Sequence, residues 1–149
     1  MDMAMFVGAR PGWIKSWPVY QAFVRRGMRP TVVATGQHHD ILLQQQAILP
    51  MPIDHWLLKE QPSLPLAELY GEIYEVAWRY LVLLQPDAVF VNGDTSSALA
   101  VATAAFHLNI PVAHIESGLR SGDLYSPYPE EFNRIAIDVA QLCRHGYAP

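Results

Sequence analysis

Short apolar runs alternate with longer segments of helical periodicity along the chain. Apolar runs without polar alternation predict buried strands at 4–7, 31–35, 88–91 and 112–115, and a further strand beginning at 145–148. Apolar residues at helical spacing predict helices at 13–26, 41–49, 66–84, 96–107 and 130–142. Four prolines between Pro50 and Pro65 predict an irregular surface connection at that point.

The order of these elements predicts the fold class. Strands that are apolar throughout, each followed by a helix, indicate a parallel sheet covered on both faces, because parallel strands need crossover connections. The length of 149 residues, with 51% apolar and 16% charged residues, fits one domain with one core. We therefore predict an α/β fold, a Rossmann-like doubly wound parallel sheet.

Charge and cysteine content exclude several classes of protein. Ten basic and 14 acidic residues give a net charge of −4, and the basic residues form no stripe, so nucleic acid is not an expected partner. The stretch from Thr95 to Ile115 has no charged residue, but His107, Asn109 and Pro111 interrupt it, so no membrane span is expected. A single cysteine, Cys143, cannot form an internal disulfide, which predicts an intracellular, cytoplasmic protein.

Three strand-to-helix loops form the candidate site, because ligands of open parallel sheets bind beyond the carboxyl ends of the strands. These loops are residues 8–15, 92–95 and 114–120. The first combines glycines and a helix N-terminus with Arg10 and Lys15, which is a suitable place for a phosphate. The simpler alternative is one exposed arginine and a lysine on a helix face. The loop matches neither the dinucleotide-binding fingerprint nor the P-loop.

Carboxylates follow the later strands. Asp94 stands at a helix start, where capping alone would explain it, and Glu130 follows Pro129 as in many first helical turns. Glu116 follows the end of a strand and is not at a helix start. Each carboxylate has a structural explanation by itself. Together with the two cations at the same sheet edge, they predict proton chemistry on a phosphorylated or nucleotide-linked ligand.

Histidine spacing predicts no metal site. His38 and His39 are adjacent, and adjacent helical residues do not face one another, so they form a poor chelating pair. His107 and His114 stand near element ends and are expected to be hydrogen-bonded structural residues. Trp13 is a candidate to line the pocket.

Five segments carry a family resemblance: Gly8-Ala9-Arg10-Pro11 with Ile14-Lys15, Gly36-Gln37-His38, Asn92-Gly93-Asp94-Thr95, Ile110 to Arg120, and Ser126 to Arg134. With them the chain, from Phe6 to its last residue, resembles the non-hydrolysing UDP-N-acetylglucosamine 2-epimerases. The last two segments are the most specific of the set. Ser126 to Arg134 favours the non-hydrolysing branch over its hydrolysing relatives.

The resemblance implies that residues 1–149 are the truncated N-terminal Rossmann-like domain of a two-domain GT-B arrangement whose second domain is absent. In that arrangement UDP-N-acetylglucosamine (UDP-GlcNAc) lies between the domains. It is converted to UDP-N-acetylmannosamine (UDP-ManNAc) by loss of UDP to give a 2-acetamidoglucal, followed by re-addition. The resemblance implies no cofactor.

The resemblance also implies roles for individual residues. It places Arg10 and Lys15 near the diphosphate, makes Asp94, Glu116 and Glu130 the catalytic carboxylates, and matches Gln37 to a regulatory UDP-GlcNAc site. It leaves open which carboxylate removes the proton from C2. Three positions depart from the usual family residues: Ala9 replaces threonine, Gly12 replaces glutamate and Asn92 replaces histidine.

The missing half of the family protein sets the expectations for partners. Half a cleft positions a substrate poorly, so the isolated chain is expected to show little or no turnover. Its exposed apolar surface is expected to favour a homodimer or the docking of a complementing C-terminal domain. Two alternatives remain at this point, a noncatalytic nucleotide-sugar binding or regulatory subunit and half of a GT-B glycosyltransferase.

Overall fold

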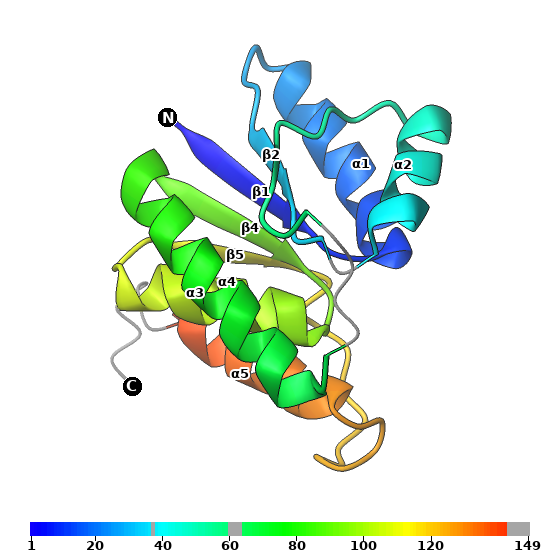
Figure 1. Ribbon diagram of the computed structural model, residues 1–149, viewed down its shortest axis with the longest axis vertical. Helices are drawn as coiled ribbons and strands as arrows, with labels where there is room; N and C mark the ends of the chain where they lie inside the picture. Colours follow the sequence, from blue (N-terminus) through cyan, green and yellow to red (C-terminus); the bar gives the residue numbers. More distant parts are fainter. Residues whose placement is uncertain (37, 60–63, 143–149) are drawn as a thin grey trace.

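A parallel sheet lies between two layers of helices in the computed structural model, which describes residues 1–36, 38–59 and 64–142 (Figure 1). The strands within these ranges are β1 (Met3–Val7), β2 (Thr31–Ala34), β3 (His55–Trp56), β4 (Ala88–Asn92) and β5 (Val112–Ile115). Their order is β3-β2-β1-β4-β5, and every pair is parallel. The helices are α1 (Arg10–Val24), α2 (His39–Ile48), α3 (Leu66–Leu84), α4 (Ser96–His107) and α5 (Glu130–Leu142). The predicted Rossmann-like α/β class is confirmed.

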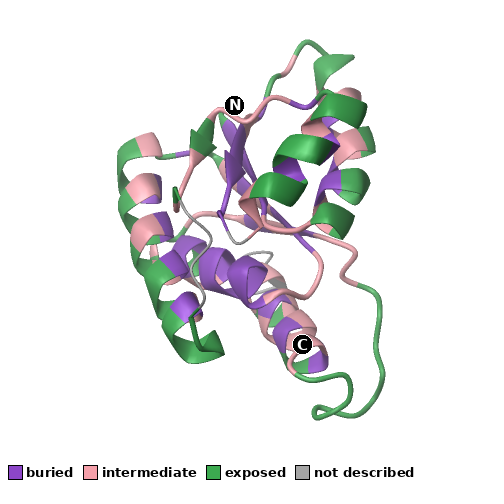
Figure 2. Ribbon diagram, turned by 45° about the vertical axis from the view of Figure 1, so that its right-hand side comes forward, coloured by how far each residue is buried: buried purple, intermediate pink, exposed green. Residues whose placement is uncertain are grey.

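The two helical layers cover opposite faces of the sheet. Figure 1 shows α1 and α2 on one face and α3, α4 and α5 on the other. Successive side chains of a strand point to opposite faces, so β1 contributes to two cores. Met5 and Val7 pack with α1 and α2, whereas Ala4 and Phe6 pack in the core that includes α3 and α4. Figure 2 shows this burial along the strands and the facing sides of the helices.

Most predicted elements agree with the structure, and one prediction is wrong. The bounds of α3, α4, β5 and α5 agree residue for residue. The connection between Pro50 and Pro65 was expected to be irregular, but it contains β3, whose His55 pairs with Val33. A two-residue edge strand held by backbone pairing has no apolar pattern that could predict it. The strand expected at 145–148 lies outside the described residues.

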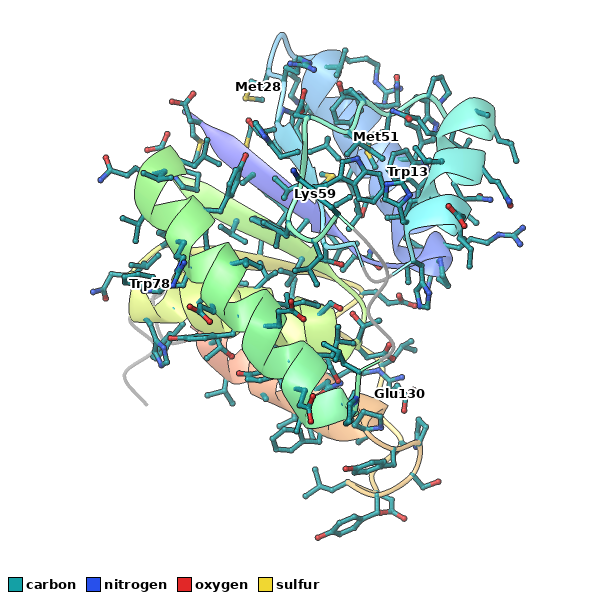
Figure 3. All side chains as sticks on the ribbon, in the orientation of Figure 1. Trp13, Met28, Met51, Lys59, Trp78 and Glu130 are labelled. Atoms are coloured by element: carbon teal, nitrogen blue, oxygen red, sulfur yellow. The ribbon has the colours of Figure 1, made fainter. Side chains whose placement is uncertain are left out.

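Trp13 lies in the core and not in the pocket. Its side chain is fully buried in the cluster with Leu42 and Met51, and Figure 3 shows it close to Met51. The indole Nε1 donates a hydrogen bond of 3.1 Å to the carbonyl of Leu49, which fixes the chain that follows α2. Trp13 therefore connects α1 to the segment after α2.

Among the described helices, none has the length and apolar content needed to cross a bilayer.

Gly36 follows β2 at a position where only glycine fits. Its φ is +88°, and a Cβ atom placed on it would lie 2.3 Å from the carbonyl oxygen of Leu58. We expect Gly36→Ala to lower the free energy of unfolding by about 2–3 kcal/mol, because it combines left-handed backbone strain with a backbone clash. Urea unfolding would measure this loss. Gly71→Ala is the control, because nothing lies within 4 Å of a Cβ placed there. Equal stability of the two variants would contradict the account of this turn.

Candidate functional site

The loops after β1, β4 and β5 meet at the carboxyl edge of the sheet and line a cleft of about 290 Å³. Gly8, Ala9 and Gly12, from the loop after β1, and residues 92–95, from the loop after β4, are among its lining residues. The strand order reverses at β1, whose neighbours are β2 and β4, and a crevice at such a reversal is where open α/β sheets bind ligands. The cleft is therefore the candidate site.

A cation and a carboxylate from different loops meet in this cleft. Lys15, on α1, donates a hydrogen bond from Nζ to Oε1 of Glu116, which follows β5. Their side chains are 44% and 27% exposed, so a ligand has access to both. Glu116 has a φ of +69°, a backbone conformation that is uncommon outside glycine and occurs often at functional sites. The structure brings these two predicted residues together.

A second ion pair lines the same cleft. Arg134, on α5, donates from Nη2 to Oδ2 of Asp94 at 2.5 Å and from Nη1 to Oε2 of Glu131 at 2.9 Å. The neighbouring Asn133 donates from Nδ2 to the carbonyl of Asp94 at 2.7 Å. The N-terminal part of α5 therefore holds both the carboxylate and the backbone of Asp94.

Capping does not explain Asp94. The cap of α4 is Thr95, whose Oγ1 accepts a hydrogen bond of 3.1 Å from the backbone N–H of Ala98. With the helix end satisfied by its neighbour, the carboxylate of Asp94 pairs with Arg134 in the cleft. The simpler of the two explanations given for Asp94 is thereby removed.

Glu131 is an almost fully buried carboxylate, with 1% of its side chain exposed. Its pKa lies below the ordinary value of 4.5, chiefly because the backbone N–H of Ser121 stabilises the ionised form; burial opposes this, and the N–H of Gly122 and Arg134 add to the lowering. A lowered pKa stabilises the fold above the unfolded-state value, and that stability is lost as the pH falls.

We therefore expect unfolding free energy to fall as the pH drops below about 4.5, and Glu131→Gln to reduce this acid dependence. Urea unfolding at about pH 7 and about pH 3.5 measures it. Glu72→Gln, at an exposed position on α3, is the control. If the two variants showed the same acid dependence, the assignment to Glu131 would be incorrect.

The other predicted residues lie at or beyond the rim of the cleft. Arg10 is exposed at the start of α1, and its neighbours Ala9 and Pro11 line the cleft, although Arg10 is not among the described lining residues. Glu130 begins α5 (Figure 3) and is not among them either. In the described part of the chain its buried Oε2 has no hydrogen-bond partner. Gln37 lies outside the described residues.

Gly12 and Asn92, two positions at which the resemblance implies a departure from the family, are neighbours in the cleft. A Cβ atom placed on Gly12 would lie 3.4 Å from Oδ1 of Asn92. A longer side chain at position 12 would need the space beside Asn92, so the residues at the two positions constrain each other. Gly12 and the amide of Asn92 therefore determine the shape of this part of the cleft.

Sequence reasoning missed Arg134 as a site residue. In the sequence Arg134 is only the last residue of a motif, whereas in the structure it carries the positive charge that pairs with Asp94. One signal was present: Glu131 and Arg134 are three residues apart, a spacing that places both on one face of a helix. The contact with Asp94 spans 40 residues and has no signal in the local pattern.

A larger hollow elsewhere has a different character. It measures about 630 Å³, and α3, α4, α5 and the segment that precedes α5 surround it. None of its described lining residues is charged, and Leu66, Tyr70 and Phe132 are among them. Acid–base chemistry needs ionisable groups, so the smaller, charged cleft is the better candidate for a reaction site.

Comparison with known proteins decides the family. The family profile described as UDP-N-acetylglucosamine 2-epimerase matches residues 22–143, most of the chain. The chain belongs to this family. The 2-epimerase of Escherichia coli (strain K12) is 40% identical over an alignment of 150 positions that covers all of this chain. The chain spans 39% of that relative's length.

Solved members of the family share the fold. The structure titled UDP-GlcNAc 2-epimerase from Neisseria meningitidis bound to UDP-GlcNAc has a TM-score of 0.87 and 36% identity, and the match covers 94% of this chain and 38% of that one. The Methanocaldococcus jannaschii 2-epimerase in complex with UDP-GlcNAc and UDP has a TM-score of 0.82 and 33% identity, with coverage of 94% and 38%. The 2-epimerase family thus includes proteins that bind the nucleotide sugar implied by the sequence motifs.

Proposed function

We propose that this chain forms one wall of a UDP-GlcNAc site, and that the whole protein interconverts UDP-GlcNAc and UDP-ManNAc. The observation that carries the proposal is the convergence of two ion pairs, Lys15 with Glu116 and Arg134 with Asp94, in one cleft. Cations that can bind a diphosphate and carboxylates that can move a proton are both needed for this reaction.

The start of α1 supports diphosphate binding. The helix has no side-chain cap, and its first backbone hydrogen bond runs from Trp13 N–H to the carbonyl of Ala9. The N–H groups of Arg10 and Gly12 precede that bond in the first turn, while Pro11 has none to offer. Free N–H groups and the positive end of the helix dipole stabilise an anion. The guanidinium of Arg10 and the ammonium of Lys15 add full charges.

The carboxylates support the proton transfers. In the proposed elimination the C2–H bond breaks, the proton passes to a carboxylate, and the C1–O bond breaks as UDP leaves with its electron pair. Re-addition of UDP to the 2-acetamidoglucal returns a proton to the other face of C2. Asp94 and Glu116 are the candidates at the cleft, with Glu130 at the beginning of α5 as a third.

Ligand binding would change the two ion pairs. A diphosphate competes with a carboxylate for the same cation, because both form charge-assisted hydrogen bonds. When Lys15 turns to the phosphate, Glu116 is released from its partner and becomes free to accept a proton. The resting ion pair thus keeps both groups in place until the substrate arrives.

The rest of the protein completes the site in this proposal. The chain spans 39% of the Escherichia coli relative, whose remaining part would supply the second wall in a GT-B arrangement. With one wall, positioning of the substrate is weak and turnover by the isolated chain is small. The same proposal makes a homodimer or a complementing C-terminal domain the expected protein partner.

The test uses a chimaera in which this chain replaces the matching segment of the Escherichia coli relative. The chimaera and the isolated chain are each incubated with UDP-GlcNAc in deuterated water. The chimaera is expected to place deuterium at C2 and to form UDP-ManNAc, whereas the isolated chain forms little. A folded chimaera that leaves C2 undeuterated, beside an active Escherichia coli protein, would refute the proposed function.

A further inference from the structure

Asp138, on α5, joins two segments behind the cleft. Its Oδ1 is hydrogen-bonded to Nδ1 of His114 at 2.6 Å, and its Oδ2 accepts a hydrogen bond from the guanidinium of Arg120. The side chain of His114 is fully buried and that of Asp138 is 17% exposed. None of the three is among the described residues that line the cleft. We call Asp138, His114 and Arg120 the Asp138 network.

The ring of His114 has an oxygen atom beside each of its nitrogens. Its Nε2 lies 2.7 Å from the carbonyl oxygen of Gly93, which can only accept, so Nε2 donates this hydrogen bond. Its Nδ1 lies 2.6 Å from Oδ1 of Asp138, whose other carboxylate oxygen pairs with Arg120. His114 thus bridges a carboxylate and a backbone carbonyl.

The ring of His114 fixes the turn that carries Asp94. Gly93 has a φ of +71°, its carbonyl is held by His114, and its N–H donates to the carbonyl of Ile115 at 3.0 Å. Gly93 directly precedes Asp94, and Ile115 directly precedes Glu116. The hydrogen bonds of Gly93 to His114 and Ile115 therefore join the turn that carries Asp94 to β5, the strand that precedes Glu116.

The second arm of the network fixes the segment after Glu116. Arg120 donates from Nη1 to the carbonyls of Ser117 at 2.8 Å and Leu119 at 2.6 Å. Its other guanidinium nitrogen is anchored by Asp138. The backbone of residues 117–119 is therefore bonded to the side chain of Arg120, which Asp138 holds in place.

We infer that Asp138 is a positioning residue, which sets the separation of the carboxylates of Asp94 and Glu116 through His114 and Arg120. The inference depends on the proposed function for what the two carboxylates do. The network itself is a property of the fold and is open to measurement without substrate. Catalytic groups placed on different loops need this kind of support, because small displacements reduce the rate strongly.

The first test is the nitrogen-15 spectrum of the histidine rings in the isolated chain at neutral pH. His114 is assigned by the signals that disappear in His114→Gln. We expect Nε2 of His114 to carry a hydrogen in the parent chain, because it faces the carbonyl oxygen of Gly93, which can only accept. A His114 ring whose Nε2 carries no hydrogen would overturn the inference.

The second test is Asp138→Asn, which keeps the volume and removes the charge. Hydrogen exchange at the Gly93 N–H is expected to become about tenfold faster, as for loss of one charge-assisted hydrogen bond, while the N–H of Val89, near the start of β4, keeps its protection. Asp87→Asn, at the opposite end of β4, is the matched control and should change neither rate. Unchanged exchange at Gly93, or equal acceleration at Val89, would overturn the inference.

The third test separates positioning from binding. In the chimaera, Asp138→Asn is expected to lower kcat by about tenfold or more with little change in KM, because the carboxylates are displaced while the diphosphate contacts remain. A change in KM alone would overturn the inference. An inactive parent chimaera refutes the proposed function, and the exchange rates of the isolated chain then still decide whether the Asp138 network holds the two turns.

Discussion

Replacing Glu116 by glutamine in the chimaera is expected to slow deuterium incorporation at C2 of UDP-GlcNAc by about 1,000-fold or more. Glutamine has nearly the same shape but can neither take up nor deliver the proton. The substitution also removes the negative charge that pairs with Lys15, whose hydrogen bond to Glu116 crosses the cleft. Initial rates of deuterium incorporation, measured by proton NMR, give the ratio directly. Asp94→Asn is expected to have an effect of the same order.

The matched control is Glu75→Gln on the exposed side of α3. Glu75 also forms an ion pair, with Arg79 at 2.5 Å, but both side chains are more than half exposed and lie on the helix surface. Exposed ion pairs of this kind contribute little to the free energy of unfolding, so the control variant should retain the rate and the stability of the parent protein. If Glu116→Gln were as active as this control, the carboxylate of Glu116 would have no part in the reaction.

Trp13→Ala is expected to lower the free energy of unfolding by about 3–5 kcal/mol, the range for truncating a buried aromatic side chain. Trp13, on α1, is fully buried, and its Nε1 donates a hydrogen bond to the carbonyl of Leu49, directly after α2. Removal leaves a cavity in the core of Met5, Leu42 and Met51 and takes away one of the two donors to the carbonyl of Leu49, the other being the N–H of Met51. Urea unfolding followed by far-UV circular dichroism gives the value.

Trp13→Phe separates packing from the hydrogen bond. It keeps much of the aromatic volume and removes the donor to Leu49, so it should cost about 1–2 kcal/mol. The Trp13 side chain does not contact the cleft in this account, so binding of UDP by the folded variant should be unchanged. A loss below about 1 kcal/mol for Trp13→Ala would show that the site collapses without a cavity, contrary to the structure.

The sequence predicted the long elements because their own patterns determine them. In α3, Leu69, Ile73 and Ala77 recur at helical spacing and are buried in the structure, and the predicted bounds agree. In β3, two residues pair with β2 through the backbone, and nothing in their side chains distinguishes them from the surrounding loop. The spacing of apolar residues predicts which positions are buried and in which type of element, whereas the pairing of a short edge strand depends on the strand beside it.

The same difference separates the predicted from the missed site residues. Lys15 and Glu116 follow strands whose carboxyl ends must meet at one sheet edge, so topology alone predicted that they would be close. Arg134 reaches Asp94 from α5, and His114 reaches Asp138, through tertiary packing. Such contacts depend on how α5 lies against the sheet. Sequence reasoning treated His114 as a hydrogen-bonded structural residue, and its hydrogen bonds are present in the structure.

The most direct test of the central claim is where UDP binds in the chimaera. Nitrogen-15 spectra recorded during a UDP titration are expected to show the largest amide shifts at the cleft, at Gly8, Gly12 and Gly93. Amides of Tyr70 and Phe132, in the larger apolar hollow, should stay in place. Shifts confined to the hollow, with none at the cleft at saturating UDP, would contradict the account.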